Sequence, residues 1–148
     1  RASLEDALTL RRSGVAAPTG ELLFDAAAFA NGIVETADGE IVLAATREKA
    51  ALFLARDANG YVERRRVPLP GGPDNLTLAP DGSILVADPL AQQLVKMNAD
   101  GKVVAQYGVR GVDPGQLNFP NDVAAVRDLV LVADRQNNRV QVVKLIDR

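Results

Sequence analysis

The sequence contains neither cysteine nor histidine among its 148 residues. Disulfides, thiol catalysis and zinc sites of the usual Cys/His kind are therefore excluded. A Ser-His-Asp triad and a histidine general base are excluded for the same reason. Any chemistry of this chain must use carboxylates, amides, hydroxyls, lysine or a bound ion.

Neither sign of charge dominates, since 17 Lys and Arg stand against 19 Asp and Glu. Nucleic-acid-binding proteins usually carry a basic face, so the sequence predicts no nucleic-acid partner. The basic run at 64–66 is interpreted as the solvated edge of an outer strand. No apolar run approaches the roughly 20 residues of a membrane span, which predicts a soluble protein with no membrane partner.

An internal repeat organises the chain. Asn31, Asn75 and Asn121 fall in register in three similar segments and recur about every 45 residues. A repeat of roughly 40 to 50 residues is typical of β-propeller blades. The sequence therefore predicts an all-β fold built from propeller blades.

Each repeat is predicted to form antiparallel strands. A short apolar stretch follows the asparagine, and an Asp-Gly pair at 38–39 or 81–82 then favours a tight turn. A continuous apolar run comes next, as expected for a strand covered on both faces. Two more strands complete a four-stranded blade. The predicted order is a helix, loop and outer strand at 1–28, then blades at 29–71, 72–118 and 119–148.

Three blades are too few for a ring, because propellers usually carry four to eight. An open stack would expose apolar faces and unpaired edges to water. We therefore expect a homo-oligomer that forms a six-bladed ring, a separate partner chain, or a missing half of the propeller.

Two short motifs carry a resemblance to a known group. The segments Phe29–Ile33 and Gly72–Leu76 resemble calcium-dependent six-bladed propeller hydrolases, namely paraoxonase-like arylesterases and the gluconolactonase/regucalcin family. The segment Arg1–Ser13 is also similar to these proteins, so the resemblance covers about residues 1–104. Beyond it, Gly115–Pro120 and Val132–Val142 look like an NHL repeat.

The resemblance implies a metal site and a reaction. Asn31, Asp74 and Asn75 match calcium ligands of the family, and Asp74 also matches a residue proposed as a catalytic base. Ca²⁺ binds six to eight hard oxygen ligands, and a bound ion can polarise the carbonyl of an ester or lactone and activate water. A glutamate ligand and a histidine pair of the family have no counterpart here, so a full calcium shell would need a second set of ligands. Asn121 is in register and is a further candidate oxygen donor.

Some of these polar residues could also have purely structural roles. Asn31 and the glycine after it are also compatible with a simple turn. Turn capping is the expected role of four further residues: Asp88, Asp134, Asn137 and Asn138. Lys96 and Arg139 are expected to lie on strand faces.

Three functions remain open at this point. The first is a calcium-dependent hydrolase of lactones or aryl esters, active as an assembled ring. The second is a non-catalytic NHL-type module that binds a protein or a small ligand. The third is a catalytically silent propeller fragment. The hydrolase is favoured, and whether this chain is an enzyme stays open.

Overall fold

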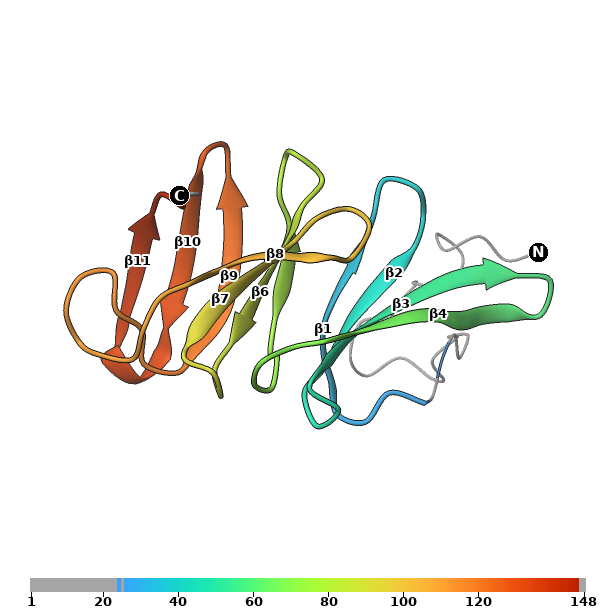
Figure 1. Ribbon diagram of the computed structural model, residues 1–148, viewed down its shortest axis with the longest axis horizontal. Helices are drawn as coiled ribbons and strands as arrows, with labels where there is room; N and C mark the ends of the chain where they lie inside the picture. Colours follow the sequence, from blue (N-terminus) through green and yellow to red (C-terminus); the bar gives the residue numbers. More distant parts are fainter. Residues whose placement is uncertain (1–23, 25, 147–148) are drawn as a thin grey trace, which may run out of the picture.

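Three antiparallel sheets lie side by side along the long axis of the molecule (Figure 1). The structure is a computed structural model that describes residues 24 and 26–146. The predicted N-terminal helix and loop lie outside the described residues, as does most of the outer strand expected before the first blade. The prediction of an all-β partial propeller is confirmed, because every described element except one short 3-10 helix is a strand.

Blade 1 is a four-stranded meander. Its strands are β1 (Ala30–Glu35), β2 (Ile41–Ala45), β3 (Ala50–Asp57) and β4 (Gly60–Pro68), paired in chain order. All five residues of β2 are buried, as expected for a strand with protein on both faces.

Blade 2 repeats the same order. Its strands are β5 (Leu76–Leu78), β6 (Ile84–Asp88), β7 (Gln93–Met97) and β8 (Val103–Tyr107). The second strand is again buried along its whole length.

Blade 3 has three described strands instead of the expected four. It contains β9 (Pro120–Val126), β10 (Leu129–Asp134) and β11 (Arg139–Val143), with the 3-10 helix η1 (Arg135–Asn137) between the last two. Within the described residues it has no fourth strand, so no described strand pairs with the outer edge of β11.

The Asp-Gly turns form as predicted, and the glycine provides the unusual backbone angle. Gly39 and Gly82 have φ values of 85° and 81°. In both turns the glycine N–H bonds to the carbonyl three residues earlier, at 3.0 and 2.9 Å. An L-residue other than Asn, Asp or Gly would be strained there.

The core consists of layers between adjacent blades. Side chains of β2 and β3 pack against those of β6 and β7, and a second layer joins blade 2 to blade 3. A third cluster covers the other face of blade 1, with Phe24 and Ala27 packed against it. Each blade thus depends on a neighbouring layer for its burial.

The basic run was interpreted as a solvated edge, and Arg65 corrects that interpretation. Its guanidinium lies 4.1 Å from the centroid of the Phe53 ring and donates to Glu40 at 2.7 Å and to the carbonyl of Asp100 at 2.6 Å. Asp100 belongs to the turn before β8, so Arg65 links blade 1 to blade 2. Its neighbour Arg66 forms ion pairs with Glu63 and Glu48.

Candidate functional site

The innermost strand starts with a β-bulge in blades 1 and 3, and with a bulge-like hydrogen-bond pattern in blade 2. In blade 1 the register shifts between Ala30 and Ile33, so that Asn31 lies within the bulge. In blade 3, Asn121 is the extra residue between the partners of Ala133 and Asp134. In blade 2 the single residue Ala87 bonds to both Asp74 and Asn75, through 2.9 and 2.8 Å backbone hydrogen bonds. Bulges re-aim side chains and are common beside functional sites.

The bulges of blades 2 and 3 bring three polar side chains into contact. The amide nitrogen of Asn121 donates to the Asp74 carboxylate at 2.6 Å. The amide nitrogen of Asn75 donates to the backbone carbonyl of Asn121 at 3.0 Å. All three residues are half-buried. Asp74, Asn75 and Asn121 therefore form one cluster, which we call the Asp74 cluster.

Blade 1 meets this cluster mainly through backbone groups. The N–H of Gly32 donates to the carbonyl of Asp74 at 2.9 Å. The exposed side chain of Asn31 donates to the Thr46 hydroxyl at 3.0 Å, and that hydroxyl donates to the Pro73 carbonyl at 2.6 Å. Of the predicted ligands, Asp74 and Asn75 are thus adjacent, whereas Asn31 is linked to them through Thr46 and the chain of blade 2.

Two aromatic residues hold strained backbone conformations next to the bulges. Phe29 and Phe119, each two residues before the bulge asparagine, have φ values of 61° and 57°. A bulky residue in the left-handed region is a genuine outlier, and such strain is concentrated at functional sites. The Arg135 guanidinium lies 5.7 Å from the centroid of the Phe119 ring. The loops that enter β1 and β9 are therefore built alike.

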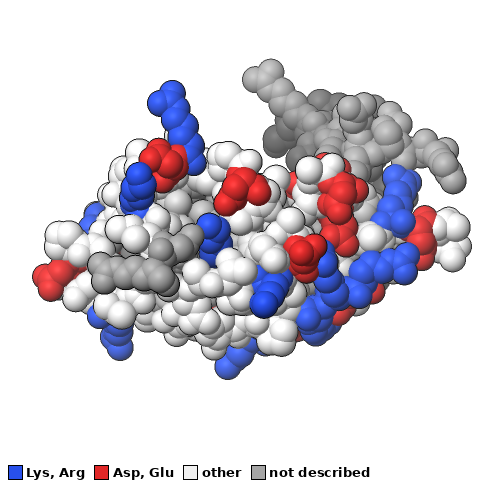
Figure 2. Space-filling view, turned by 45° about the horizontal axis from the view of Figure 1, so that its top comes forward, with Lys and Arg blue, Asp and Glu red and all other residues white. Residues whose placement is uncertain are grey.

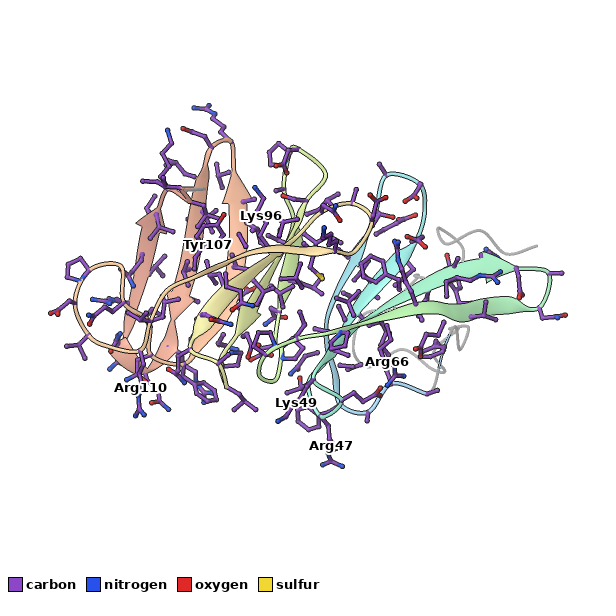
Figure 3. All side chains as sticks on the ribbon, in the orientation of Figure 1. Arg47, Lys49, Arg66, Lys96, Tyr107 and Arg110 are labelled. Atoms are coloured by element: carbon purple, nitrogen blue, oxygen red, sulfur yellow. The ribbon has the colours of Figure 1, made fainter. Side chains whose placement is uncertain are left out.

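Positive side chains project from the same end of the blades. Arg47, Lys49 and Arg110 lie at the lower edge of Figure 3, where β1, β5 and β9 begin. All three are exposed. The face turned forward in Figure 2 belongs to the opposite end, and there basic and acidic side chains are intermixed.

Oxygen donors of the cluster suit a hard cation. Asp74 offers a carboxylate, and each asparagine whose Nδ2 is engaged keeps its Oδ1 for another partner. These oxygens are the ligand type that Ca²⁺ binds, but they are fewer than the six to eight it needs. Among the described residues no group of three His, Cys, Asp or Glu side chains gathers to hold a metal. The three residues therefore offer fewer oxygen donors than one calcium ion requires.

Gly32 fixes how closely blade 1 approaches the cluster. A β-carbon there would lie 2.8 Å from the Cα of Asn75, 2.9 Å from the nitrogen of Leu76 and 3.0 Å from the carbonyl of Asp74. These are backbone atoms, so no side-chain rotation relieves the contact. We expect Gly32→Ala to lower the free energy of unfolding by about 1–3 kcal/mol.

Urea denaturation measures this effect. Ile33→Ala serves as the control, because Ile33 is exposed and adjacent, and its truncation should change stability by less than about 0.5 kcal/mol. Equal stability of Gly32→Ala and the wild type would mean that the blades are not held at this distance.

A network around Asp134 was not recognised from the sequence. The carboxylate of Asp134 is completely buried. It accepts hydrogen bonds from the Asn118 N–H, Asn137, Arg139 and Gln141, at 2.7 to 3.0 Å. Burial alone would raise the pKa of Asp134, but these bonds and the charge of Arg139 outweigh it and lower the pKa below its usual value. Asp134 makes no side-chain capping bond to the turn that follows it, η1; it accepts the N–H of Asn118 in the loop before β9 instead.

Arg139 was predicted to lie on a strand face, but its guanidinium also reaches a distant loop. Besides Asp134, it donates to the carbonyls of Val112, Asp113 and Gln116 at 2.7 to 2.9 Å. It thereby fixes the long connection between β8 and β9. Asp88, the counterpart of Asp134 in blade 2, is also fully buried and caps the loops at Gly71 and Ala91. Residues 134–141 include Asp134, Asn137, Arg139 and Gln141, and this concentration of polar side chains was the signal from which the network could have been predicted.

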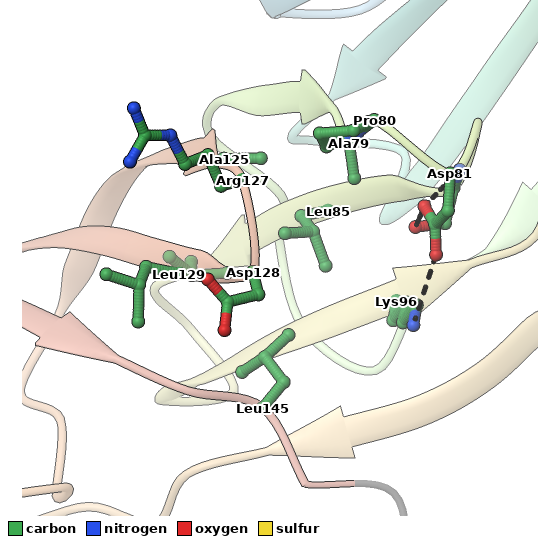
Figure 4. A pocket seen from close by; sticks show the side chains of 12 residues that line it. Ala79, Pro80, Asp81, Leu85, Lys96, Ala125, Arg127, Asp128, Leu129 and Leu145 are labelled. Atoms are coloured by element: carbon green, nitrogen blue, oxygen red, sulfur yellow. Dashed lines mark hydrogen bonds and ion pairs between the residues drawn. The ribbon is translucent and has the colours of Figure 1, made fainter.

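One pocket with a defined lining is away from the Asp74 cluster. It lies between blades 2 and 3 at the opposite end and has a volume of about 220 Å³ (Figure 4). Apolar side chains, Leu85 and Leu145 among them, line much of it, and Lys96 pairs with Asp81 at 3.7 Å on one side.

Residues 117–143 match the NHL repeat. The chain is also similar in fold to three solved structures of greater length. A protein of unknown function from Bacteroides caccae has a TM-score of 0.63 and 17% identity, with 76% of this chain and 44% of that chain covered. A streptogramin B lyase has a TM-score of 0.61 and 19% identity, with coverages of 78% and 37%. A catalytically inactive variant of virginiamycin B lyase from Staphylococcus aureus, with quinupristin, has a TM-score of 0.60 and 16% identity, with coverages of 82% and 43%.

These likenesses establish the β-propeller fold and its NHL-type third blade. At such identities they show the fold alone. The chain spans less than half the length of each of the three structures. Among the residues that the structure describes, no helix has the length and apolar character needed to cross a membrane.

Proposed function

We propose that this chain provides part of the active site of a calcium-dependent β-propeller hydrolase that cleaves esters or lactones. The observation that carries the proposal is the Asp74 cluster, in which one carboxylate and two asparagines from adjacent blades meet at the start of the inner strands. The strained loops at Phe29 and Phe119 support it, because strain of this kind is concentrated where function requires it.

Asp74, Asn75 and Asn31 would hold the ion, with Asn121 as a further donor. A bound calcium ion supplies a Lewis acid for the substrate carbonyl. Asp74 acts as the base that takes a proton from the attacking water, and the 2.6 Å bond from Asn121 holds its carboxylate in position. Cations at the same end, such as Lys49, favour the approach of substrates with negative groups.

The test is calcium binding by isothermal titration calorimetry with Asp74→Ala. Because a carboxylate is the strongest oxygen donor of the cluster, we expect the affinity for Ca²⁺ to fall at least tenfold, together with hydrolysis of aryl esters and lactones. Calcium at 100 times its dissociation constant should stabilise the wild type by about 2.7 kcal/mol.

Asp128→Ala is the matched control, since Asp128 is an exposed aspartate at the opposite end of the blades. Unchanged calcium affinity in Asp74→Ala, or no calcium binding by the wild type, would refute the proposal.

A non-catalytic binding module is the second candidate, and the NHL match of residues 117–143 favours it. Within that repeat, Asp134 and Arg139 are engaged in hydrogen bonds inside the protein. Calcium-independent capture of a small ligand or a protein by the wild type, with no hydrolysis, would support this candidate.

A further inference from the structure

The outward face of blade 3 is an exposed apolar surface. Its members are paired across the three strands and therefore point to the same side. We call this surface the open face; its apolar members are Ala124, Val126, Leu129, Leu131, Ala133, Val140 and Val142. Asp122, opposite Ala133, lies at the edge of the same face. Val140 and Val142 are 67% and 62% exposed. A shallow hollow of about 150 Å³ lies between the small residues of this face and Val140.

Most of the counterparts of these positions in the other two blades are buried; the exception is Lys96, the half-buried counterpart of Val142 in blade 2. Val140 and Val142 correspond to Ala51 and Phe53 of blade 1, which are completely buried. In blade 2 the counterpart of Val140 is Leu94, which is 2% exposed. In each case the next blade provides the cover, as shown by the apolar clusters between blades 1 and 2 and between blades 2 and 3. The repeat therefore indicates what belongs on the open face, namely the first face of another blade.

Blade 1 of a second copy has the matching surface. Blade 2 covers blade 1 with four side chains: Ile84, Val86, Val95 and Met97. Their counterparts in blade 1, by strand pairing, are Ile41, Leu43, Leu52 and Leu54. These four are equally aliphatic and form one cluster. Blade 1 of a second copy thus has an aliphatic face like the one with which blade 2 covers blade 1.

We propose that the open face of blade 3 receives blade 1 of a second copy, so that two chains close one ring of six blades. Each copy covers the open face of the other, which gives a closed two-fold assembly. The ring would bring two sets of Asp74, Asn75 and Asn121 to one end of a common channel. Such doubling would raise the number of oxygen donors toward the six to eight that Ca²⁺ requires.

Docking must compete with a contact inside the chain. The matching face of blade 1 is buried in the single chain, where Phe24 and Ala27 pack against it. These residues must move away before a second copy can dock. The dimer is therefore expected to depend on concentration, and shortening Phe24 should favour it.

Light scattering and sedimentation of the full chain test the proposal without any assay of hydrolysis. Phe24→Ala should strengthen self-association at least threefold, whereas Phe29→Ala, which shortens a 63% exposed phenylalanine, should leave it unchanged. Val140→Lys should weaken self-association at least tenfold, because the counterparts of Val140, Ala51 and Leu94, are both buried between blades. Val104→Lys is its control, because Val104 is a 51% exposed valine on the outer strand of blade 2.

Two outcomes would overturn the proposal. One is a monomer at every concentration for both the wild type and Phe24→Ala, with circular dichroism showing that the variant is folded. The other is a dimer in which a single Val142→Cys substitution forms a disulfide between identical positions, because the chain has no other cysteine and such a bond requires two open faces in contact. Loss of calcium binding with the dimer intact would instead count against the proposed hydrolase alone.

Discussion

Replacing Asp134 by alanine is expected to lower the free energy of unfolding by about 3–5 kcal/mol. The carboxylate is completely buried, and Arg139 donates to it at 2.8 Å. Without it, the guanidinium and the amides of Asn137 and Gln141 lose their common acceptor inside the protein. These three side chains keep backbone carbonyls as acceptors, so the main losses are the ion pair with Arg139 and the acceptor of the Asn118 N–H, whose desolvation is then uncompensated. Chemical denaturation monitored by circular dichroism measures the loss.

The pH dependence provides a separate check on the Asp134 network. Because folding lowers the pKa of Asp134, its contribution is complete above the pKa of the unfolded chain, about 3.9. The contribution disappears as the pH falls through the lower pKa of the folded state. The difference in stability between the wild type and Asp134→Asn should therefore be constant near pH 7 and shrink below about pH 4.

Asp128→Ala is the control for the charge itself. Its carboxylate is 68% exposed and pairs with Lys144 at 3.1 Å, a surface contact worth at most about 1 kcal/mol. A loss for Asp134→Ala no larger than that of the control would show that the buried network adds nothing specific to stability.

The blades could be predicted because their signals are local. The Asp-Gly turns at Gly39 and Gly82 and the continuous apolar runs after them depend on a few adjacent residues, and the structure has both. The repeat then placed Asn31, Asn75 and Asn121 at equivalent points. What it could not provide is which side chains meet, since Asn121 bonds to Asp74 across 47 positions of the chain.

Residues with long polar side chains were predicted least well. Arg65 and Arg139 were assigned to solvent or to strand faces because a charged residue is usually exposed. Both instead reach backbone carbonyls of distant loops, at Asp100 and at Val112. Such contacts depend on how the connecting loops fold back, and no local pattern encodes that.

Phe53→Ala is expected to reduce the free energy of unfolding by about 3–5 kcal/mol. Its ring is completely buried in the layer between blades 1 and 2, beneath the guanidinium of Arg65. The ring also lies close to the turn before β8, where a β-carbon on Gly101 would come within 2.9 Å of its Cζ. Removing the ring leaves a cavity that β-sheet backbones on both sides cannot collapse to fill. It also removes the aromatic partner of the half-buried Arg65 guanidinium.

Two comparisons make the Phe53 prediction specific. Phe53→Leu keeps most of the volume and should cost less than Phe53→Ala, because the remaining cavity is smaller. Phe29→Ala removes the same atoms from a ring that is 63% exposed and should cost less than about 1 kcal/mol. Thermal and urea unfolding of the three variants would rank them. If Phe53→Ala were no less stable than Phe29→Ala, blades 1 and 2 would not be held together by this layer, and the repeat argument for a further blade on blade 3 would lose its basis as well.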